Sequence, residues 1–308
     1  MQIYHTLTPA SAPQDSAVAL GYFDGVHSGH RAVLGAAVTY AAQHGLTAAA
    51  FTFELPGNNS LKGGRILSLA QKHTRVAQLG IAQYWEPSFE EFRALSPEDF
   101  VRRVLVDCFH AKAVFCGDNF TFGAYAAGNV ALLEQLCAPY GITVDVVPMA
   151  QYDGQTVSST RIRAALEEGR LDDANAMLGK PYAIDWAVTH GKGIGSGKLG
   201  TPTINQNYPA EALQPCTGVY LTRIWLDGQW RPAATGIGRR PTVDSSANAA
   251  VTCETFVPDY VGNVYGQTPL LEFHKYLCPV RKFGSMDELA ALIHHAAEES
   301  KAYFAAQH

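Results

Sequence analysis

The sequence has few cysteines, no excess of positive charge and no long apolar run. None of its six cysteines has Cys-x-x-Cys spacing, which disfavours a thiolate metal site, and we expect buried free thiols in a reducing cytoplasm. The formal net charge of −5 disfavours a nucleic-acid partner. No stretch of about 18 apolar residues predicts a membrane span, and the amino terminus does not resemble a signal peptide. The composition therefore favours a cytoplasmic protein that neither binds nucleic acid nor spans a membrane.

The chain has 308 residues, of which 47% are hydrophobic, enough for two domains of ordinary size. In the first half, short apolar runs alternate with helical patterns, which predicts an α/β domain with a parallel sheet covered on both faces. Ligands of such sheets bind at the carboxyl ends of the strands. The predicted strands are Ala17–Leu20, Thr47–Phe53, Tyr84–Trp85, Ala113–Cys116 and Thr143–Val147, and the predicted helices are Arg31–His44, Leu69–Leu79, Pro97–Cys108 and Val130–Tyr140.

The pattern changes near residue 180, where strands separated by Gly, Pro and Asp turns replace the alternation. An antiparallel β-barrel or sandwich closed by one terminal helix fits this half. Two short helices, Ser159–Glu168 and Leu171–Leu178, connect the halves, so we place the domains at residues 1–179 and 180–308. The predicted strands are Ala183–His190, Gly218–Trp225, Trp230–Ile237, Val251–Phe256 and Thr268–Tyr276, and the terminal helix is Met286–Ala306.

Two histidines form the most informative motif. His27 and His30 follow the first predicted strand, in a glycine-punctuated turn that leads into a helix. Glycines let the backbone approach a ligand, and a helix start presents free N–H groups to an anion. Two imidazoles separated by two residues can donate to one phosphate and stabilise charge during nucleotidyl transfer. The alternative is a metal pair or two surface histidines, but no carboxylate or cysteine stands nearby at ligand spacing.

Two further turns, 52–56 and 117–123, also follow predicted strands, so three turns converge on one crevice. A third motif opens a predicted helix with Ser159, Thr160, Arg161 and Arg163. A hydroxyl there is a good helix cap, which is the purely structural interpretation. The structural interpretation leaves two arginines one turn away unexplained. Hydroxyls, helix N–H groups and guanidinium groups together make a triphosphate-binding edge.

The second half has a glycine-rich stretch, residues 190–200, that can wrap phosphate with backbone amides, although its spacing is not that of a Walker A loop. Glycine-rich hairpins are common, so the Pro-Thr-x-Asn that follows is more specific. Thr203 and Asn205 point to one side of a strand and can hold Mg²⁺ beside phosphates. Glu254 lies in a predicted strand; it is either a solvent-facing carboxylate or the base for a substrate hydroxyl.

At these residues the chain resembles the bacterial bifunctional riboflavin kinase/FAD synthetases. The amino half is similar to the FMN adenylyltransferase module in Gly-x-Phe-Asp-Gly-x-His-x-Gly-His, Gly-Asp-Asn-Phe-Thr-Phe-Gly and Ser-Ser-Thr-Arg-Ile-Arg (residues 21–30, 117–123 and 158–163). The carboxyl half is similar to the riboflavin kinase module in Pro-Thr-x-Asn, Gly-Val-Tyr, Ile-Gly-x-Arg-Pro-Thr and Glu-Thr (202–205, 218–220, 237–242 and 254–255). The resemblance covers nearly the whole chain in the expected order.

The resemblance implies two ATP-dependent steps: riboflavin is phosphorylated to FMN, and FMN is adenylylated to FAD with release of pyrophosphate. Thr203 and Asn205 would hold Mg²⁺ with ATP, Glu254 would be the general base, and His27 and His30 would stabilise charge on the α-phosphate. The ATP and phosphate contacts it implies are Gly21, Phe23, Asp24, Gly25, Asn119, Ser159, Thr160, Arg161 and Arg163 in the amino half, and Gly191, Gly193, Gly195, Gly197, Lys198 and Pro202 in the carboxyl half.

The departures from the family pattern lie in the kinase half. The loop is one residue longer, its usual Arg is missing, and Thr201 stands where the family has Phe. Residues 278–283 read Cys-Pro-Val-Arg-Lys-Phe and lack the usual Arg and Glu. Lys192, Lys198 or Arg281 can compensate by charge, without the bidentate geometry of Arg. Two alternatives therefore stay open: an adenylyltransferase with a weakened or lost kinase, and a non-catalytic flavin-binding sensor. We expect ATP, riboflavin and FMN as its small-molecule partners, and a monomer or weak homo-oligomer.

Overall fold

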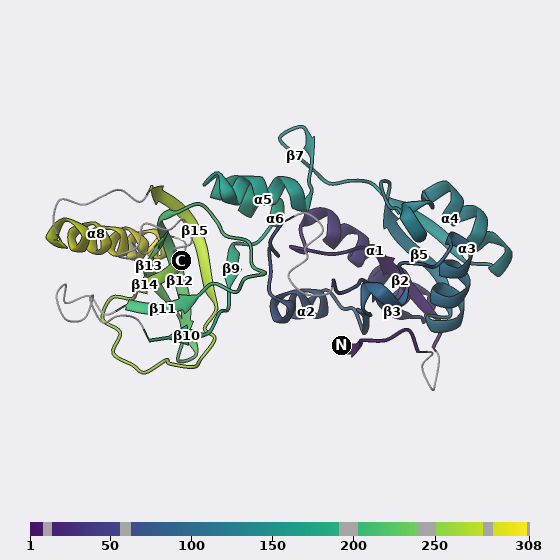
Figure 1. Ribbon diagram of the computed structural model, residues 1–308, viewed down its shortest axis with the longest axis horizontal. Helices are drawn as coiled ribbons and strands as arrows, with labels where there is room; N and C mark the ends of the chain where they lie inside the picture. Colours follow the sequence, from purple (N-terminus) through teal and green to yellow (C-terminus); the bar gives the residue numbers. More distant parts are fainter. Residues whose placement is uncertain (9–13, 56–62, 191–202, 240–250, 280–285, 307–308) are drawn as a thin grey trace. The chain divides into compact units, whose positions relative to one another are not determined.

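The computed structural model describes residues 1–8, 14–55, 63–190, 203–239, 251–279 and 286–306 (Figure 1). The chain folds into two compact units. The amino-terminal unit is Met1–Gly63 with Leu69–Ser159, and the carboxyl-terminal unit is Gly64–Ser68 with Thr160–His308. The two connecting helices thus pack with the carboxyl-terminal unit. The functional boundary at residues 179 and 180 stays a prediction.

The amino-terminal unit is built on a six-stranded sheet in which every neighbouring pair is parallel, as the sequence predicted. The strand order is β1-β4-β3-β2-β5-β6. From β2 the chain moves outward through β3 to β4 and then returns to the other side of β2 to form β5. The strands are β1 (Gln2–Tyr4), β2 (Ser16–Leu20), β3 (Thr47–Phe51), β4 (Gln83–Trp85), β5 (Ala111–Gly117) and β6 (Thr143–Val147).

Helices cover both faces of this sheet. Small and large side chains alternate along β2, so the two faces of this strand meet different helices. Ala17 and Ala19 of β2 point to the face on which Tyr40 of α1 meets Phe115 of β5, with ring centroids 5.5 Å apart. Val18 and Leu20 point to the opposite face, into a core with the η2 helix. The helices are α1 (Ser28–His44), α2 (Leu69–Gln78), α3 (Pro97–Asp99), the π-helix η2 (Phe100–Cys108) and α4 (Val130–Cys137), with short 3₁₀ turns η1 (Phe89–Glu91), η3 (Ala124–Ala126) and η4 (Ala138–Tyr140).

The return of the chain across β2 creates a topological switch point between β2 and β5. Connections leave the carboxyl ends of these two strands in opposite directions, and sheets of this kind bind ligands at such a point. The turn with His27 and His30 follows β2, and the turn 117–123 follows β5. The predicted convergence of these turns is therefore a consequence of the strand order. The sequence analysis missed β1 and the small hairpin of β7 (Gln151–Tyr152) and β8 (Gln155–Thr156).

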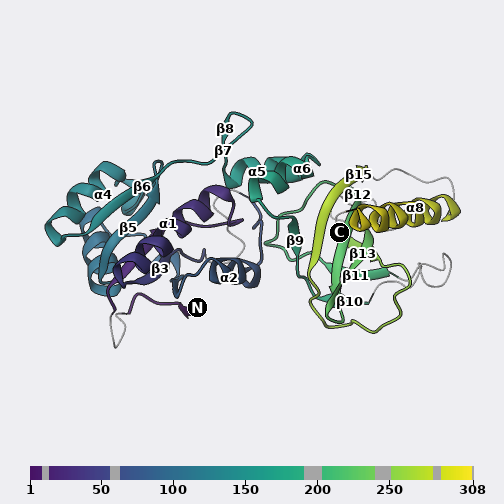
Figure 2. The same cartoon turned by 180° about the vertical axis from the view of Figure 1, so that it is seen from behind.

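The carboxyl-terminal unit contains a seven-stranded antiparallel sheet in the order β10-β11-β14-β13-β12-β15-β9. The predicted strand 183–190 is two strands, and these form the two opposite edges of the sheet. The helices α5 and α6 precede it, and α8, yellow in Figures 1 and 2, covers one face. The elements are α5 (Ser159–Glu167), α6 (Leu171–Leu178), β9 (Tyr182–Ile184), β10 (Val188–Thr189), β11 (Thr203–Asn207), β12 (Gly218–Leu226), β13 (Gln229–Arg239), β14 (Val251–Phe256), β15 (Leu271–Cys278) and α8 (Met286–Ala305).

The short connection between the two edge strands forces this sheet to curl. Seven flat strands at about 4.8 Å spacing would hold their edges about 29 Å apart. The chain from Ile184 to Val188 reaches about 15 Å at most. The curled half-barrel is joined at Val188, which donates to the Gln267 carbonyl (2.9 Å) and accepts from the Gly266 amide (3.1 Å). Buried Gln206 donates to the Trp186 and Pro269 carbonyls, so its side chain joins the same seam.

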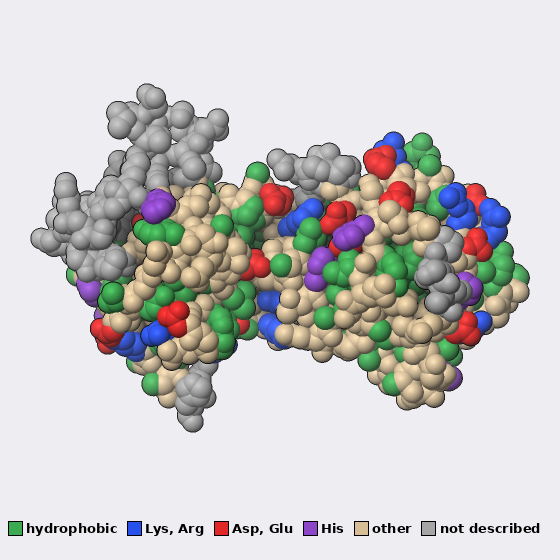
Figure 3. Space-filling model, turned by 90° about the horizontal axis from the view of Figure 1, so that it is seen from below, with side chains coloured by type: hydrophobic (Ala, Val, Ile, Leu, Met, Phe, Trp, Pro, Cys, Tyr) green, Lys and Arg blue, Asp and Glu red, His purple; other side chains and the backbone are tan. Residues whose placement is uncertain are grey.

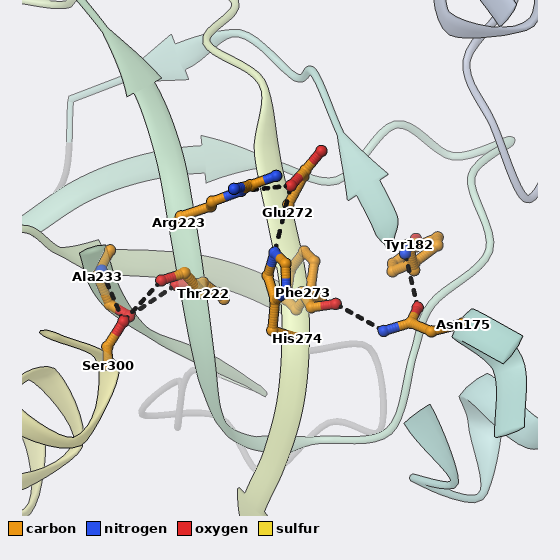
Figure 4. A network of polar contacts seen from close by, with 9 residues as sticks. All are labelled: Asn175, Tyr182, Thr222, Arg223, Ala233, Glu272, Phe273, His274 and Ser300. Atoms are coloured by element: carbon orange, nitrogen blue, oxygen red, sulfur yellow. Dashed lines mark hydrogen bonds and ion pairs between the residues drawn. The ribbon is translucent and has the colours of Figure 1, made fainter. Parts of the chain in front are cut away.

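A polar network ties α8 and α6 to the strands (Figure 4). The Ser300 hydroxyl of α8 donates to the Thr222 carbonyl (2.9 Å) and accepts from the Ala233 amide (3.2 Å), and all three residues are buried. The side-chain oxygen of Asn175 in α6 accepts a hydrogen bond from the Tyr182 backbone amide, and its side-chain nitrogen donates to the Phe273 carbonyl. These two bonds link β9 to β15. An apolar side chain at Ser300 or Asn175 could not make these hydrogen bonds.

An ion network lies beside this polar network. Glu272 accepts hydrogen bonds from Arg223 (2.6 Å) and His274 (3.2 Å), and the Arg223 guanidinium lies over the rings of Trp230 and Phe304. Burial raises the pKa of Glu272, but these two hydrogen bonds and the arginine charge outweigh burial and lower the pKa overall. Phe304 belongs to α8, so this network also holds the helix against the sheet.

The six cysteines are free, as the sequence predicted. Four of them are buried, and burial raises the pKa of each thiol. The pKa reaches about 11 for Cys108 and Cys116 and about 12 for Cys137 and Cys253. These thiols are therefore protonated at neutral pH and chemically unreactive.

Replacing Ser300 by alanine tests how α8 is attached. The substitution removes the two buried hydrogen bonds of the Ser300 hydroxyl, so we expect a loss of about 1–3 kcal/mol in the free energy of unfolding. Urea denaturation followed by tryptophan fluorescence measures it, because Trp186, Trp225 and Trp230 lie in this unit. Glu299→Ala, an exposed change on the same helix, is the control, and an equal loss in both variants would contradict the assignment.

Candidate active sites

The turn after β2 has a strained backbone. Phe23 and Val26 have positive φ values of 55° and 44°, which side chains larger than glycine rarely adopt, and Gly25 between them has φ of 86°. A Cβ on Gly21 would lie 2.7 Å from the Phe23 ring, so only glycine fits there. Strain of this kind persists where the surrounding structure enforces it, and it is concentrated at functional sites.

His27 is the N-cap of α1, which begins at Ser28 rather than at the predicted Arg31. Nδ1 of His27 accepts a hydrogen bond from the His30 backbone amide (3.3 Å). An imidazole nitrogen that accepts carries no proton, so a neutral His27 has its proton on Nε2. Nδ1 of His27 therefore accepts a hydrogen bond at the start of the helix, and its Nε2 remains a hydrogen-bond donor.

The two imidazoles stack with ring centroids 3.5 Å apart, and the edge of His30 meets the Phe23 ring. Burial, with a smaller effect from the Arg31 charge, lowers the pKa of His27 to about 4. Burial, His27 and Lys72, in that order, hold the pKa of His30 well below its usual value. Both rings are therefore neutral at neutral pH. Within the described residues, Nδ1 of His30 is buried without a hydrogen-bond partner, as expected of a group that a ligand would satisfy.

Neighbouring segments are hydrogen-bonded to this turn. The Thr52 hydroxyl, directly after β3, donates to the Tyr22 carbonyl (2.9 Å), and the Ser159 hydroxyl at the start of α5 donates to the Asp24 carbonyl (2.8 Å). The structure thus brings Gly21, Phe23, Asp24, Gly25 and Ser159 together around the histidines. Asn119 follows β5 at the other side of the switch point and is exposed.

The arginines of the third motif differ in their surroundings. Arg163 is buried, and its Nε donates to the Gly64 carbonyl (2.9 Å). This contact gives Arg163 a structural role within the carboxyl-terminal unit, and a role in phosphate binding stays a prediction. Arg161 is half-buried and Thr160 is exposed. The unit boundary falls between Ser159 and Thr160, so the structure leaves the roles of Thr160 and Arg161 as predictions.

The sequence analysis missed Lys72 as a candidate residue. This lysine lies on α2, is only 7% exposed, and its Nζ donates to the Thr52 hydroxyl at 3.2 Å. The sequence holds no clear signal for it, because the buried face of α2 consists of Gln71, Lys72 and Val76 and is not an apolar stripe. A buried lysine is unusual and marks a position worth testing.

The carboxyl-terminal unit brings together the three residues predicted for phosphoryl transfer. Asn205 of β11 lies directly opposite Glu254 of β14, and Thr203 lies opposite Phe256. Because alternate residues of a strand share a face, Thr203, Asn205 and Glu254 all project from the same face of the sheet. The Asn205 amide nitrogen donates to the Thr203 carbonyl at 3.2 Å. The register therefore places a hydroxyl, an amide and a carboxylate side by side.

The donor set at Thr203 and Asn205 fits magnesium. Mg²⁺ prefers oxygen ligands and takes few of them from the protein, since phosphates and water complete its shell. Among the described residues, no group of three or more His, Cys, Asp or Glu could hold a metal ion. A carboxylate-rich metal centre is thus absent from that part of the chain, and a site shared with ATP phosphates needs none.

The other predicted contacts of this half lie outside the described residues. They are Gly191, Gly193, Gly195, Gly197, Lys198 and Pro202, and the departures at Thr201 and Val280 lie outside as well, as do Lys192 and Arg281. Cys278 is described and ends β15, opposite Val219 of β12. The effect of the altered loop on the kinase stays a prediction.

Comparison with known proteins assigns both units. The FAD synthetase family model matches residues 10–161, and the riboflavin kinase model matches residues 178–304. A bifunctional riboflavin kinase/FMN adenylyltransferase from Bacillus subtilis is 33% identical over 94% of this chain and 92% of its own length. Enzymes of the same name from Pseudomonas fluorescens and Escherichia coli are 32% and 31% identical over 89% and 92% of this chain, and over 88% and 91% of their own lengths.

The chain belongs to the bifunctional riboflavin kinase/FMN adenylyltransferase family. It therefore has two activities, phosphorylation of riboflavin and adenylylation of FMN, with ATP, riboflavin and FMN as substrates. The resemblance and the fold class predicted from the sequence are both confirmed. A crystal structure of a Streptococcus pneumoniae protein described as a macrolide-efflux protein has the same fold, with a TM-score of 0.85 and 25% identity over 97% of this chain and 98% of that one.

Two further observations concern partners of this family member. No helix in the described part of the chain is both long and apolar enough to span a membrane. On the face shown in Figure 3, Lys and Arg side chains are interspersed with Asp and Glu. The predictions of no nucleic-acid partner and of a monomer or weak homo-oligomer stay predictions.

The lowered pKa of His27 predicts a pH dependence of stability. The unfolded chain takes up a proton near pH 6.5 and the folded His27 only near pH 4, so stability is lost as the pH falls between these values. His27→Asn keeps a good N-cap without the titration. Between pH 7 and pH 4.5 the wild-type amino-terminal unit should lose about 2–3 kcal/mol more than the variant. Hydrogen exchange of the α1 amides measures this, and parallel pH profiles would contradict it.

Proposed function

We propose that the turn of residues 21–30 carries adenylyl transfer and that the shared face of Thr203, Asn205 and Glu254 carries phosphorylation of riboflavin. The hydrogen bonds that join Thr52 and Ser159 to the strained turn after β2 support the first assignment most strongly. The register of Asn205 against Glu254 supports the second. The two reactions then use separate residues of one chain.

In adenylyl transfer, a phosphate oxygen of FMN attacks the α-phosphorus of ATP. The bond from that phosphorus to the bridging oxygen breaks, and pyrophosphate leaves with its electron pair. Negative charge builds on the α-phosphate oxygens, and neutral imidazoles of His27 and His30 donate hydrogen bonds to them. The FMN phosphate is already ionised at neutral pH, so the step needs no base. The helix start of α1 adds backbone N–H groups to the same site.

In the kinase reaction, the 5′-hydroxyl oxygen of riboflavin attacks the γ-phosphorus of ATP, and ADP leaves. The hydroxyl proton passes to the Glu254 carboxylate as the new bond forms. Thr203 and Asn205 would hold Mg²⁺, which neutralises phosphate charge when it is bound. We also propose a cytoplasmic location, since four buried and protonated thiols are compatible with a reducing compartment.

A product assay tests the proposed pair of activities. One sample of the protein receives riboflavin with ATP and Mg²⁺, and another receives FMN with ATP and Mg²⁺. FMN and FAD in the first sample are the products expected from the two activities of the family. FAD in the second sample alone would mean that the altered loop has disabled the kinase. No product in either sample would favour the flavin-binding sensor.

Glu254→Gln should separate the two reactions. An amide cannot accept the hydroxyl proton, so we expect FMN formation to fall by about 10²- to 10⁴-fold. FAD formation from added FMN should stay within about twofold of wild type, because the changed residue belongs to the other unit. Surviving FMN formation would show that another group acts as the base.

His30→Gln should give the opposite result. Removal of the imidazole should lower FAD formation from FMN by about 10²- to 10³-fold, the usual effect of losing one donor to a developing charge. FMN formation from riboflavin in the same preparation serves as the control and should be unchanged. Normal adenylylation in this variant would remove His30 from the proposed site.

A further inference from the structure

Lys72 is a buried cation at the carboxyl edge of the parallel sheet, and the predicted roles of the site make no use of it. It is only 7% exposed. Its Nζ lies 3.2 Å from the Thr52 hydroxyl, 5.0 Å from the centroid of the Tyr22 ring and 5.9 Å from that of Tyr84. Tyr22 follows β2, Thr52 follows β3 and Tyr84 lies in β4. The ammonium group thus lies near one residue of β4 and near residues that follow β2 and β3.

A hydrogen-bonded chain leads from this amine to the histidine turn. Lys72 donates to the Thr52 hydroxyl, and the same hydroxyl donates to the Tyr22 carbonyl at 2.9 Å. Tyr22 lies next to Phe23, the residue with positive φ whose ring meets the edge of His30. A change at Lys72 therefore propagates through Thr52 to the backbone that places the imidazoles.

Burial of the Lys72 ammonium group lowers the stability of the fold, whereas an apolar residue of similar length would not lower it. Moving an ammonium group out of water is unfavourable, even when hydrogen bonds and aromatic faces compensate in part. Its charge also acts on the site, because Lys72 contributes to the lowered pKa of His30. Lys72 lies near the rings of Tyr22 and Tyr84, and the other ionisable groups that act on or contact Tyr84 are Glu54, His73 and Glu86. Two of these are carboxylates, but the effect of Lys72 on His30 still favours the neutral ring.

We propose that Lys72 is a positioning residue for adenylyl transfer, which holds the 21–30 turn against the end of β3 through the Thr52 hydroxyl. A second effect follows from its charge, which favours the neutral form of His30. The proposal rests on the assignment of adenylyl transfer to that turn, and the His30→Gln variant tests that assignment separately.

Lys72→Met and Lys72→Arg test the proposal in the full-length protein. Methionine keeps an unbranched chain of similar length and removes both the charge and the donor. Because misplacement of a catalytic group by about 1 Å costs about 10²-fold, we expect kcat for FMN adenylylation to fall by about 10- to 100-fold. The KM values for FMN and ATP should change by less than about threefold, since this role involves no substrate contact. The arginine variant keeps the charge and should recover much of the loss.

Nuclear magnetic resonance of the imidazoles measures the pKa of His30, which would not change if Lys72 had a merely structural role. Removal of the positive charge should raise the pKa of His30 in Lys72→Met, and Lys72→Arg should keep it close to wild type. The His30→Gln spectrum assigns the resonance. Lys112→Met is the matched control, because Lys112 of β5 is half-exposed and paired with Asp15 on the surface. That control should change neither kcat nor the pKa of His30.

Three results would overturn the proposal. One is a wild-type kcat with an unchanged His30 pKa in Lys72→Met. Another is a loss confined to KM, which would make Lys72 a substrate-binding residue. If Lys72→Met fails to fold, Thr52→Val decides, because valine breaks the hydrogen-bonded chain and leaves the charge in place. Its kcat should fall while the pKa of His30 stays near wild type, and a full kcat in Thr52→Val would be the third contrary result.

Discussion

The hydrogen bond from the His30 amide to Nδ1 of His27 is the contact on which the amino-terminal site depends. It begins α1 at Ser28, fixes the neutral tautomer of His27 and brings the two rings into a stack. Burial then keeps both imidazoles neutral, since a charged stack would repel itself in a poorly solvated place. Nδ1 of His27 takes part in the helix cap, and the other imidazole nitrogens of the two residues remain for hydrogen bonds to phosphate oxygens.

The two units place their site residues in different ways. In the amino-terminal unit, the strand order brings separate turns to one edge of a parallel sheet, and hydroxyls of Thr52 and Ser159 hold those turns together. In the carboxyl-terminal unit, antiparallel register alone places Asn205 beside Glu254. A slip of one residue would turn one of these side chains to the opposite face, so the seam at Val188 and Gln206 contributes to function by fixing the register.

Much of this arrangement follows from local sequence patterns. The short apolar run Ala17–Leu20 predicted a strand, and the alternation of such runs with helical patterns predicted a parallel sheet with its ligand site at the carboxyl ends of the strands. The start of α1 was placed three residues late because histidine is an uncommon N-cap. The split of 183–190 into two strands depends on closure of the curled sheet, which no short window of sequence contains. The role of Lys72 depends on distant Thr52 and Tyr22, and a helical pattern alone assigns lysine to the surface.

The most direct test of this account is a long-range proton–nitrogen correlation spectrum of the histidine side chains at pH 7. We expect both His27 and His30 to be neutral and His27 to carry its proton on Nε2, with Nδ1 showing the chemical shift of an unprotonated acceptor. A charged ring in either residue, or a His27 proton on Nδ1, would contradict the cap and the site that is built on it.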